Sequence, residues 1–237
     1  MLVLGTNSRG PFPPPDLRLI MPPTDAPTLI LGTRNQKKGL ELALLIAPPW
    51  EPSSRLARLN VRPLDADIDV EEDADTFAGN ARKKASETAR AVGQWVLADD
   101  SGLAVDALKG APGVFSARYA GVHGDDEANN LKVLADLAHV ADDRRGAAFV
   151  CALALADPTG AIRLEASGAC RGRLIREPRG TNGFGYDPLF LIPEYHRTFG
   201  ELSSLVKSRL SHRSRAFTHF RPGLDRLLAL GAFDQRV

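Results

Sequence analysis

The sequence predicts an α/β fold, and two patterns carry the prediction. After residue 27, short apolar runs alternate with segments of helical period, which is typical of strands connected by helices. Further along, two apolar runs flank the turn cluster Asp157-Pro-Thr-Gly160, which is typical of a β-hairpin. With 237 residues, 43% of them hydrophobic and 25% charged, the chain can form one sizeable core or two small ones, and collagen-like, coiled-coil and wholly disordered classes are excluded.

The first 27 residues are predicted to form a disordered tail outside the fold. Seven of the 17 prolines fall in this segment, which has no sustained helical or strand period. We therefore expect a single domain over residues 28–237.

The first half of this domain is predicted to alternate strands and helices. Prolines bound the linker after the first helix, and an acidic run supplies the N-cap of the second. The expected elements are a strand at 28–32, a helix at 35–47, a strand at 59–64, a helix at 76–92, a strand at 95–98, a short antiparallel return at 103–108, a turn at 111–113 and a helix at 125–139.

The second half is predicted to add a layer of antiparallel strands. The hairpin strands are expected at 149–156 and 162–169, followed by a Gly-rich loop at 179–187 and a short strand at 189–192. A helix is expected from Ser211, with a break at Pro222 because proline lacks the N–H group that the helix needs.

Charge and hydropathy narrow the function classes. The formal net charge of +1 leaves no global field for a polyanion, so nucleic acid is not expected as a partner, whereas a local pocket for a small phosphate ligand is compatible with it. No apolar run approaches the roughly 18 residues of a membrane helix, and no signal peptide is evident, so we expect a cytoplasmic protein without membrane contact. Cys151 and Cys170 are expected to be buried small hydrophobes.

The first candidate site lies between the first strand and the first helix. Backbone N–H groups and the helix dipole favour phosphate at such a helix start, and two lysines would add positive charge. The loop is not a Walker A motif, and an ordinary helix start with solvated lysines is the alternative. The candidate phosphate-binding residues are Thr33, Arg34, Asn35, Gln36, Lys37 and Lys38.

The second candidate site is a pair of adjacent carboxylates, Asp99 and Asp100, at the end of the apolar run 95–98. Because successive strand residues point to opposite faces, the two side chains are expected to have different roles. Carboxylates that face phosphate oxygens call for Mg²⁺, which takes one or two protein carboxylates. The alternatives are a simple Asp-Ser-Gly turn here and a solvated loop for the acidic run at 65–75.

The third candidate site is late in the chain. Aromatic residues between glycines in the 179–187 loop suit a planar base, because glycine allows close approach of the backbone. Lys207 can meet a phosphate, and His212 and Arg213 can donate to a base carbonyl from a helix capped by Ser211. A turn-rich hairpin followed by a basic helix start is the alternative reading.

Together these segments resemble the inosine-triphosphate pyrophosphatase family, from residue 28 to about residue 230. The most specific block is Ala98-Asp-Asp-Ser-Gly-Leu103 continuing into Ala111-Pro-Gly-Val-Phe-Ser-Ala-Arg-Tyr-Ala120. The other blocks, in the family's order, are Thr33 to Glu41, Glu71 to Ala81, Gly183 to Pro188 and Ser211 to Arg213.

The resemblance implies an elongated, central mixed sheet flanked by helices, with two lobes and an active-site cleft between them. It implies Mg²⁺-dependent hydrolysis of ITP, dITP and XTP between the α and β phosphates, in a homodimer. Glu71 and Asp100 would bind the metal, with Asp100 also the proton acceptor. Substrate binding would fall to residues 33–38 together with Ser101, Phe184, Gly185, Tyr186, Asp187, Lys207, His212 and Arg213.

Two alternatives to this function stay open. The metal site alone does not select the base, so a pyrophosphatase of modified pyrimidine nucleotides is one, and a nucleotide-binding module without catalysis is the other. Arg34 stands where the family usually has glycine, which puts affinity in question more than the reaction.

Overall fold

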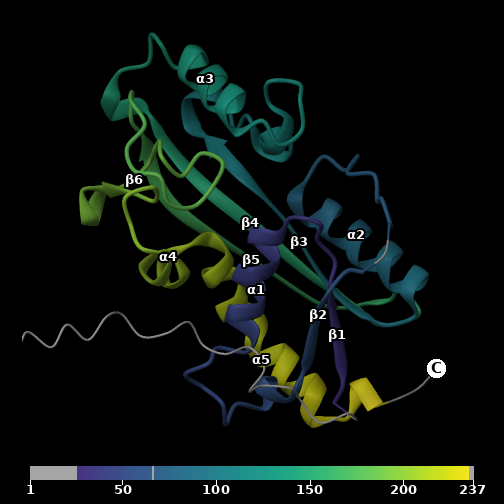
Figure 1. Cartoon of the computed structure of the whole chain (residues 1–237). Coiled ribbons are helices and arrows are strands. Elements are labelled where there is room, and N and C mark those ends of the chain that lie inside the picture. Colours follow the sequence, from purple (N-terminus) through teal and green to yellow (C-terminus); the bar gives the residue numbers. More distant parts are fainter. Residues whose placement is uncertain (1–25, 66, 235–237) are drawn as a thin grey trace, which may run out of the picture.

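The computed structural model describes residues 26–65 and 67–234, so the predicted tail, apart from Ala26 and Pro27, lies outside the described residues. Figure 1 shows the arrangement of the elements. The strands are β1 (Thr28–Leu31), β2 (Asn60–Pro63), β3 (Trp95–Val105), β4 (Gly146–Ala156), β5 (Ile162–Leu174), β6 (Phe190–Ile192) and β7 (Arg197–Thr198). The α-helices are α1 (Gln36–Ile46), α2 (Phe77–Val92), α3 (Asp126–Asp136), α4 (Ser204–Leu210) and α5 (His212–Ala229).

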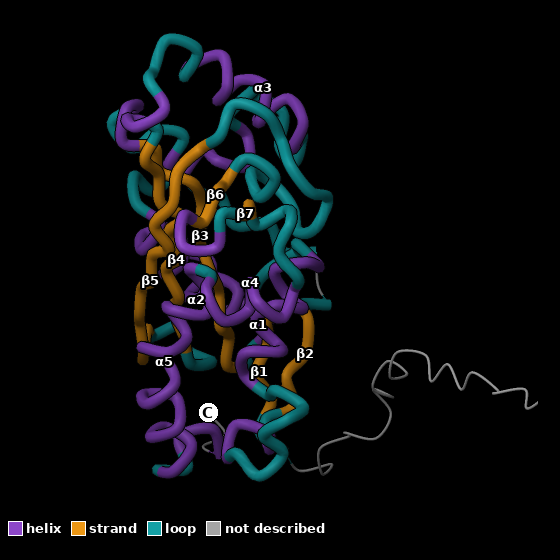
Figure 2. Tube along the Cα trace, turned by 90° about the vertical axis from the view of Figure 1, so that its left-hand side faces the viewer, coloured by secondary structure: helices purple, strands orange, loops and turns teal. Residues whose placement is uncertain are grey.

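The described strands form one mixed sheet in the order β2-β1-β3-β4-β5-β6-β7. β1 runs parallel to β2 and β3, and all later pairings are antiparallel, which confirms the predicted α/β class and the hairpin of β4 and β5. The long strands β3, β4 and β5 extend through the whole molecule and give it an elongated shape (Figure 1, Figure 2).

Helices cover both faces of the sheet and create three clusters of buried side chains. On one face, leucines of β1, β3 and β4 pack with aromatic residues of α5 and with α1. On the other face, the alanine-rich stripe of α2 packs against alternate residues of the same strands. A third cluster, rich in phenylalanine, joins α3 to β6 and the far half of β3 and β4. The sheet therefore separates α2 from α1 and α5.

β3 is one continuous strand, which corrects the predicted break after residue 98 and the predicted return at 103–108. Its residues pair with β4 from Val96 opposite Ala156 to Val105 opposite Ala147. Gly102 interrupts no pairing; a Cβ there would collide with Ser116 of the short 3-10 helix at Gly113–Arg118, which packs on the strand. The adjacent carboxylates therefore lie in the middle of a strand rather than at its end.

Two further differences concern helices. α5 continues through Pro222, which corrects the predicted break. The missing N–H group removes only one helical hydrogen bond, and buried Phe220 and Leu224 on either side of the proline keep the helix packed. α4, a single short helix before Ser211, was not predicted from the sequence.

Within the described part of the chain, none of the helices has both the length and the apolar character required to span a membrane.

Candidate active site

A cleft of about 630 Å³ opens where β1 ends and β3 continues. The last pair of the β1–β3 ladder is Leu31 with Leu97, after which Gly32 N donates to Leu97 O and the chain turns away. Beyond Leu97, β1 no longer pairs with this edge of β3, which lies next to the loop that leads into α1. Polar residues of this loop, of β3 and of α2 line the cleft, namely Thr33, Arg34, Asn35, Lys38, Lys84, Asp100 and Ser101.

The loop between β1 and α1 forms a capped helix start that lines the cleft. The Asn35 side chain accepts from the backbone N–H groups of Lys37 and Lys38, at 3.0 and 3.2 Å, and so caps α1. Arg34 reaches across the cleft mouth to the carboxylates of Asp67 and Asp69, at 3.2 and 3.6 Å. The positive charge of this loop is thus directed at the cleft and its rim.

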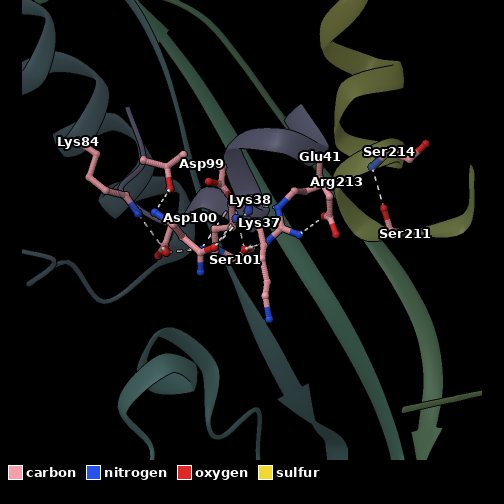
Figure 3. Close-up of polar contacts among 12 residues, drawn as sticks. Lys37, Lys38, Glu41, Lys84, Asp99, Asp100, Ser101, Ser211, Arg213 and Ser214 are labelled. Atoms are coloured by element: carbon pink, nitrogen blue, oxygen red, sulfur yellow. Dashed lines mark hydrogen bonds and ion pairs between the residues drawn. The ribbon is translucent and has the colours of Figure 1, made fainter. Parts of the chain in front are cut away.

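Asp99 faces α1 and α5, where it is buried among cations. Arg213 Nε donates to Asp99 Oδ2 at 3.2 Å, and Lys38 Nζ lies 3.8 Å from the same oxygen (Figure 3). Burial would raise the pKa of the Asp99 carboxyl, but Lys38 and Arg213 hold it well below its ordinary value. Arg213 also donates to Glu41 Oε2 at 2.6 Å and to Ser101 Oγ at 2.8 Å, so this ionised pair ties β3 to both helices.

Asp100 points to the opposite side of the sheet, as the alternation of a strand requires. Asn80 Nδ2 donates to Asp100 Oδ2 at 3.1 Å, and Lys84 Nζ lies 3.4 Å from Oδ1 and 3.1 Å from Glu72 Oε1. Burial and the neighbouring Glu72 raise the pKa of Asp100 above the ordinary aspartate value, and Lys84 offsets this only in part. The expectation that the two aspartates point to opposite faces is confirmed, and their different roles stay a prediction.

Asn80 and Lys84 are site residues that the sequence analysis missed. They are four residues apart on α2 and therefore share the helix face that meets Asp100. Burial alone would lower the pKa of Lys84, but Asp100, Asp99 and Glu72 raise it above the ordinary lysine value, so the ammonium stays charged. The i, i+4 spacing of an amide and a scarce lysine was the signal that could have found them.

The Gly-rich loop places one aromatic ring beside the phosphate-binding loop. The half-buried Phe184 ring has Lys207 Nζ 4.7 Å, Arg213 Cζ 5.5 Å and Lys37 Nζ 5.7 Å from its centroid. Buried Lys207 also contacts Asp187 Oδ2 at 2.6 Å. Residues far apart in the sequence therefore meet around Phe184, on the side of β3 that carries Asp99.

Three predicted site residues have no contact with the polar groups described above. Tyr186 is buried in the phenylalanine-rich cluster and donates to Ser116 O at 2.9 Å, so its ring offers no face to a base and instead anchors the loop. Gln36 is exposed. Glu71 is exposed as well, and Glu72 is the carboxylate that the structure brings next to Lys84 and Asp100.

His212 is buried against the Phe149 ring, with 4.9 Å between the ring centroids, and among the described residues its Nδ1 has no hydrogen-bond partner. Burial, together with the charges of Arg213 and Lys207, lowers the pKa of His212 well below 6.5. The folded protein therefore keeps this imidazole neutral at a pH at which the unfolded chain takes up a proton.

This difference predicts a pH dependence of stability. Below about pH 6.5, His212 should lower the free energy of unfolding by about 1.4 kcal/mol per pH unit, because the unfolded state binds the additional proton. Urea unfolding between pH 6.5 and 5 gives the slope of the free energy of unfolding against pH, and His212→Gln should remove the part of that slope due to His212. His139→Gln, which replaces an exposed histidine, serves as the control and should leave that part in place. An unchanged slope in His212→Gln would contradict the assignment.

The donor set beside Asp100 fits a hard divalent cation. The ammonium of Lys84 lies between the oxygens of Asp100 and Glu72, which shows that the two carboxylates together can hold a positive charge. Among the described residues, no group of three or more His, Cys, Asp or Glu side chains could by itself hold a metal ion. The pair Asp100 and Glu72 is within the one or two carboxylates by which proteins commonly hold Mg²⁺, with water and substrate phosphate completing the shell.

A family model decides the relationship of the chain to known proteins. The model of the Ham1 family matches residues 29–223, a range that includes all the residues of the cleft and of the Phe184 surroundings. The chain belongs to the Ham1 family. The resemblance inferred from the sequence motifs is thereby confirmed.

Individual members of the Ham1 family match closely. A dITP/XTP pyrophosphatase of Rhodopirellula baltica is 58% identical over 84% of this chain and 94% of its own length, and one of Desulforamulus reducens is 48% identical over 84% and 96%. Among solved structures, a HAM1 protein from Coxiella burnetii superposes with a TM-score of 0.73 at 37% identity, over 85% of this chain and 98% of the other. The mixed sheet and the helices around it are therefore those of the Ham1 fold.

Proposed function

We propose that this protein is a Mg²⁺-dependent pyrophosphatase of non-standard purine nucleoside triphosphates. Its substrates would be ITP, dITP and XTP, cleaved between the α and β phosphates to the nucleoside monophosphate and pyrophosphate. Two relatives named dITP/XTP pyrophosphatase, matched over nearly their whole length, support this assignment. The working domain would be residues 28–237, with the preceding tail outside it, in a cytoplasmic homodimer that binds neither nucleic acid nor membrane.

The observation that carries the proposal is the placement of Asp99 and Asp100 on opposite sides of one strand. Asp99 organises Arg213 and Lys38 near Phe184, and Asp100 stands in the cleft between the α1 loop and α2. A binding module needs only the first group. The second group, a carboxylate of raised pKa beside Lys84 and Glu72, is suited to accept a proton.

Each group of the cleft has a role in this reaction. The capped start of α1 and the Lys38 ammonium bind the phosphate chain. Asp100 accepts a proton from the attacking water while the water oxygen forms a bond to the α phosphorus. The bond between the α phosphorus and the oxygen that bridges to the β phosphorus then breaks, which releases pyrophosphate. Lys84 lies where it can compensate charge on the phosphates, and Asn80 keeps the Asp100 carboxylate oriented.

Asp100, with Glu71 or Glu72, would hold the metal. When bound, Mg²⁺ supplies charge neutralisation for the phosphates and lowers the pKa of a coordinated water. The exposed Glu71 and the cleft-facing Glu72 are adjacent, so separate Ala variants of the two would assign the ligand.

Base selection would occur beside Phe184. Three N–H groups of Arg213 already bind Asp99, Glu41 and Ser101, which leaves two others of its five for a ligand. A 6-oxo purine would offer an acceptor to such donors, or to His212, whose Nδ1 has no partner within the described part of the chain, whereas adenine would place an amino group against them. Because sites built around a required hydrogen bond reject the wrong partner strongly, discrimination against ATP should be large.

A substrate panel tests the proposal. With ITP, XTP, dUTP, GTP and ATP, each with Mg²⁺, pyrophosphate should be released from ITP and XTP with kcat/KM about 10²-fold or more above that for ATP. Preference for dUTP would instead support a pyrimidine enzyme. Release from none of the five would leave the nucleotide-binding module as the better interpretation.

A further inference from the structure

Helix α3 contacts both backbone polar groups of Gly185, its N–H and its C=O. Gly185 N donates to Asp126 Oδ2 at 2.7 Å, and Asn130 Nδ2 donates to Gly185 O at 3.0 Å. The two side chains are four residues apart and so share one face of α3. This helix lies at the opposite end of the molecule from α5, and neither residue lines the cleft or contacts Asp99 (Figure 1).

The loop that α3 contacts needs external support. Gly183 and Gly185 have φ angles of 78° and 60°, in the left-handed region that glycine adopts readily, and they flank Phe184. A segment with glycine on both sides of one aromatic residue has many accessible backbone conformations, so its native geometry costs conformational entropy. Contacts from outside the loop must therefore fix the direction in which the Phe184 ring points.

The contacts around Phe184 divide between two partners. On its N-terminal side, the Phe184 N–H donates to Asp187 Oδ2 at 2.8 Å, and Asp187 is paired with Lys207. On its C-terminal side, Asp126 accepts from the N–H of Gly185, and Asn130 donates to the carbonyl oxygen of the same residue. The contact with Asp187 belongs to the charged residues around Phe184 described above, whereas the contacts with Gly185 come from a separate helix, α3.

We propose that Asp126 and Asn130 are positioning residues that orient Phe184 toward the purine base. The role rests on the proposed function, because it concerns the base-binding part of the same site. The pair acts on the backbone of Gly185 alone, so it sets the affinity for the base without altering the phosphate-binding loop or Asp100. Specificity in this protein then depends partly on a helix that does not touch the substrate.

Hydrogen exchange of the wild-type protein and its variants tests the contact itself. In Asp126→Ala, amide exchange of a peptide covering residues 180–187 should be about fivefold faster or more, the size expected for the loss of one hydrogen bond. Asp126→Asn, which keeps an acceptor oxygen, should restore slow exchange. Glu127→Ala, which removes the neighbouring exposed acid of the same helical turn, should leave that peptide unchanged and serves as the matched control.

Kinetics test the role. Asp126→Ala and Asn130→Ala should each raise KM for ITP about fivefold and change kcat less than twofold, whereas the inhibition constant of inorganic tripolyphosphate, which has no base, should stay at the wild-type value. Asp126→Asn should recover most of the wild-type KM. Glu127→Ala should match the wild type in both quantities.

The outcomes separate the two proposals. Unchanged exchange and unchanged KM in both alanine variants would overturn the positioning role, and so would an equal weakening of tripolyphosphate inhibition, which would indicate a general disturbance of the site. If the wild-type protein releases no pyrophosphate from ITP, the proposed function fails, and calorimetric titration with ITP replaces KM in the same comparison of variants.

Discussion

Asp100→Asn is expected to reduce kcat for ITP by at least about 10³-fold while the fold is retained, because it would remove both the proposed proton acceptor and a proposed metal ligand. The amide oxygen of asparagine can still accept from the Ser101 N–H, whereas the amide nitrogen that replaces the other oxygen cannot accept from Asn80 Nδ2, so one local hydrogen bond is lost and the other is kept. Pyrophosphate release at saturating ITP and Mg²⁺ measures the effect, and circular dichroism monitors the fold.

Asp73→Asn provides the comparison for Asp100→Asn. Asp73 is an exposed carboxylate that pairs with Lys83 outside the cleft lining, so its loss should change kcat less than twofold. Activity retained in Asp100→Asn would move the proton-accepting role elsewhere, with Asp99 the first candidate.

Arg213→Met is expected to destabilise the protein by about 3–5 kcal/mol, because it leaves the buried carboxylate of Asp99 without its main partner. The Asp99 side chain is 0% exposed, so water does not reach its carboxylate to replace the lost contact. Glu41 and Ser101 lose hydrogen bonds in the same step. Urea unfolding at pH 7 measures the change as a lower midpoint at an unchanged m value.

Arg209→Met tests whether this cost comes from burial. Arg209 is an exposed arginine at the end of α4, and its replacement should change the free energy of unfolding by less than about 0.5 kcal/mol. If Arg213→Met were as stable as Arg209→Met, the ion pair with Asp99 would not contribute to stability in the way described.

Local signals in the sequence accounted for most of the elements and for the identity of the site. Ser211 caps α5 and accepts from the Ser214 N–H, as predicted, because a cap depends only on its own neighbours in the chain. The lysine-containing loop at the start of α1 and the charged residues at the start of α5 were recognised for the same reason. The sequence alone does not show that these residues lie near Asp99, because that proximity depends on the fold. The resemblance of the motifs, in their order, to a known family is what predicted that they belong to one site.

Features that depend on distant partners were the ones that sequence reasoning missed. The polar segment from Asp99 to Gly102 resembles a turn when read alone, and it is a strand because β4 pairs with it along its whole length. Lys84 reads as one of two solvated lysines until α2 is packed against Asp100. Pro222 reads as a helix end, and packing of its neighbours overrides that local preference.

The unbroken register of β3 against β4 also limits how this segment of the chain can change in length. Between Val96 and Val105 each residue has one partner on β4, with no bulge to absorb an additional residue. A one-residue insertion or deletion before Asp99 would turn each of the two carboxylates to the opposite face of the sheet. Asp99 would then point toward Lys84, and Asp100 toward Arg213. Substitutions can therefore adjust this enzyme's chemistry gradually, whereas any change in the spacing between Val96 and Asp99 disrupts the two halves of the site at once.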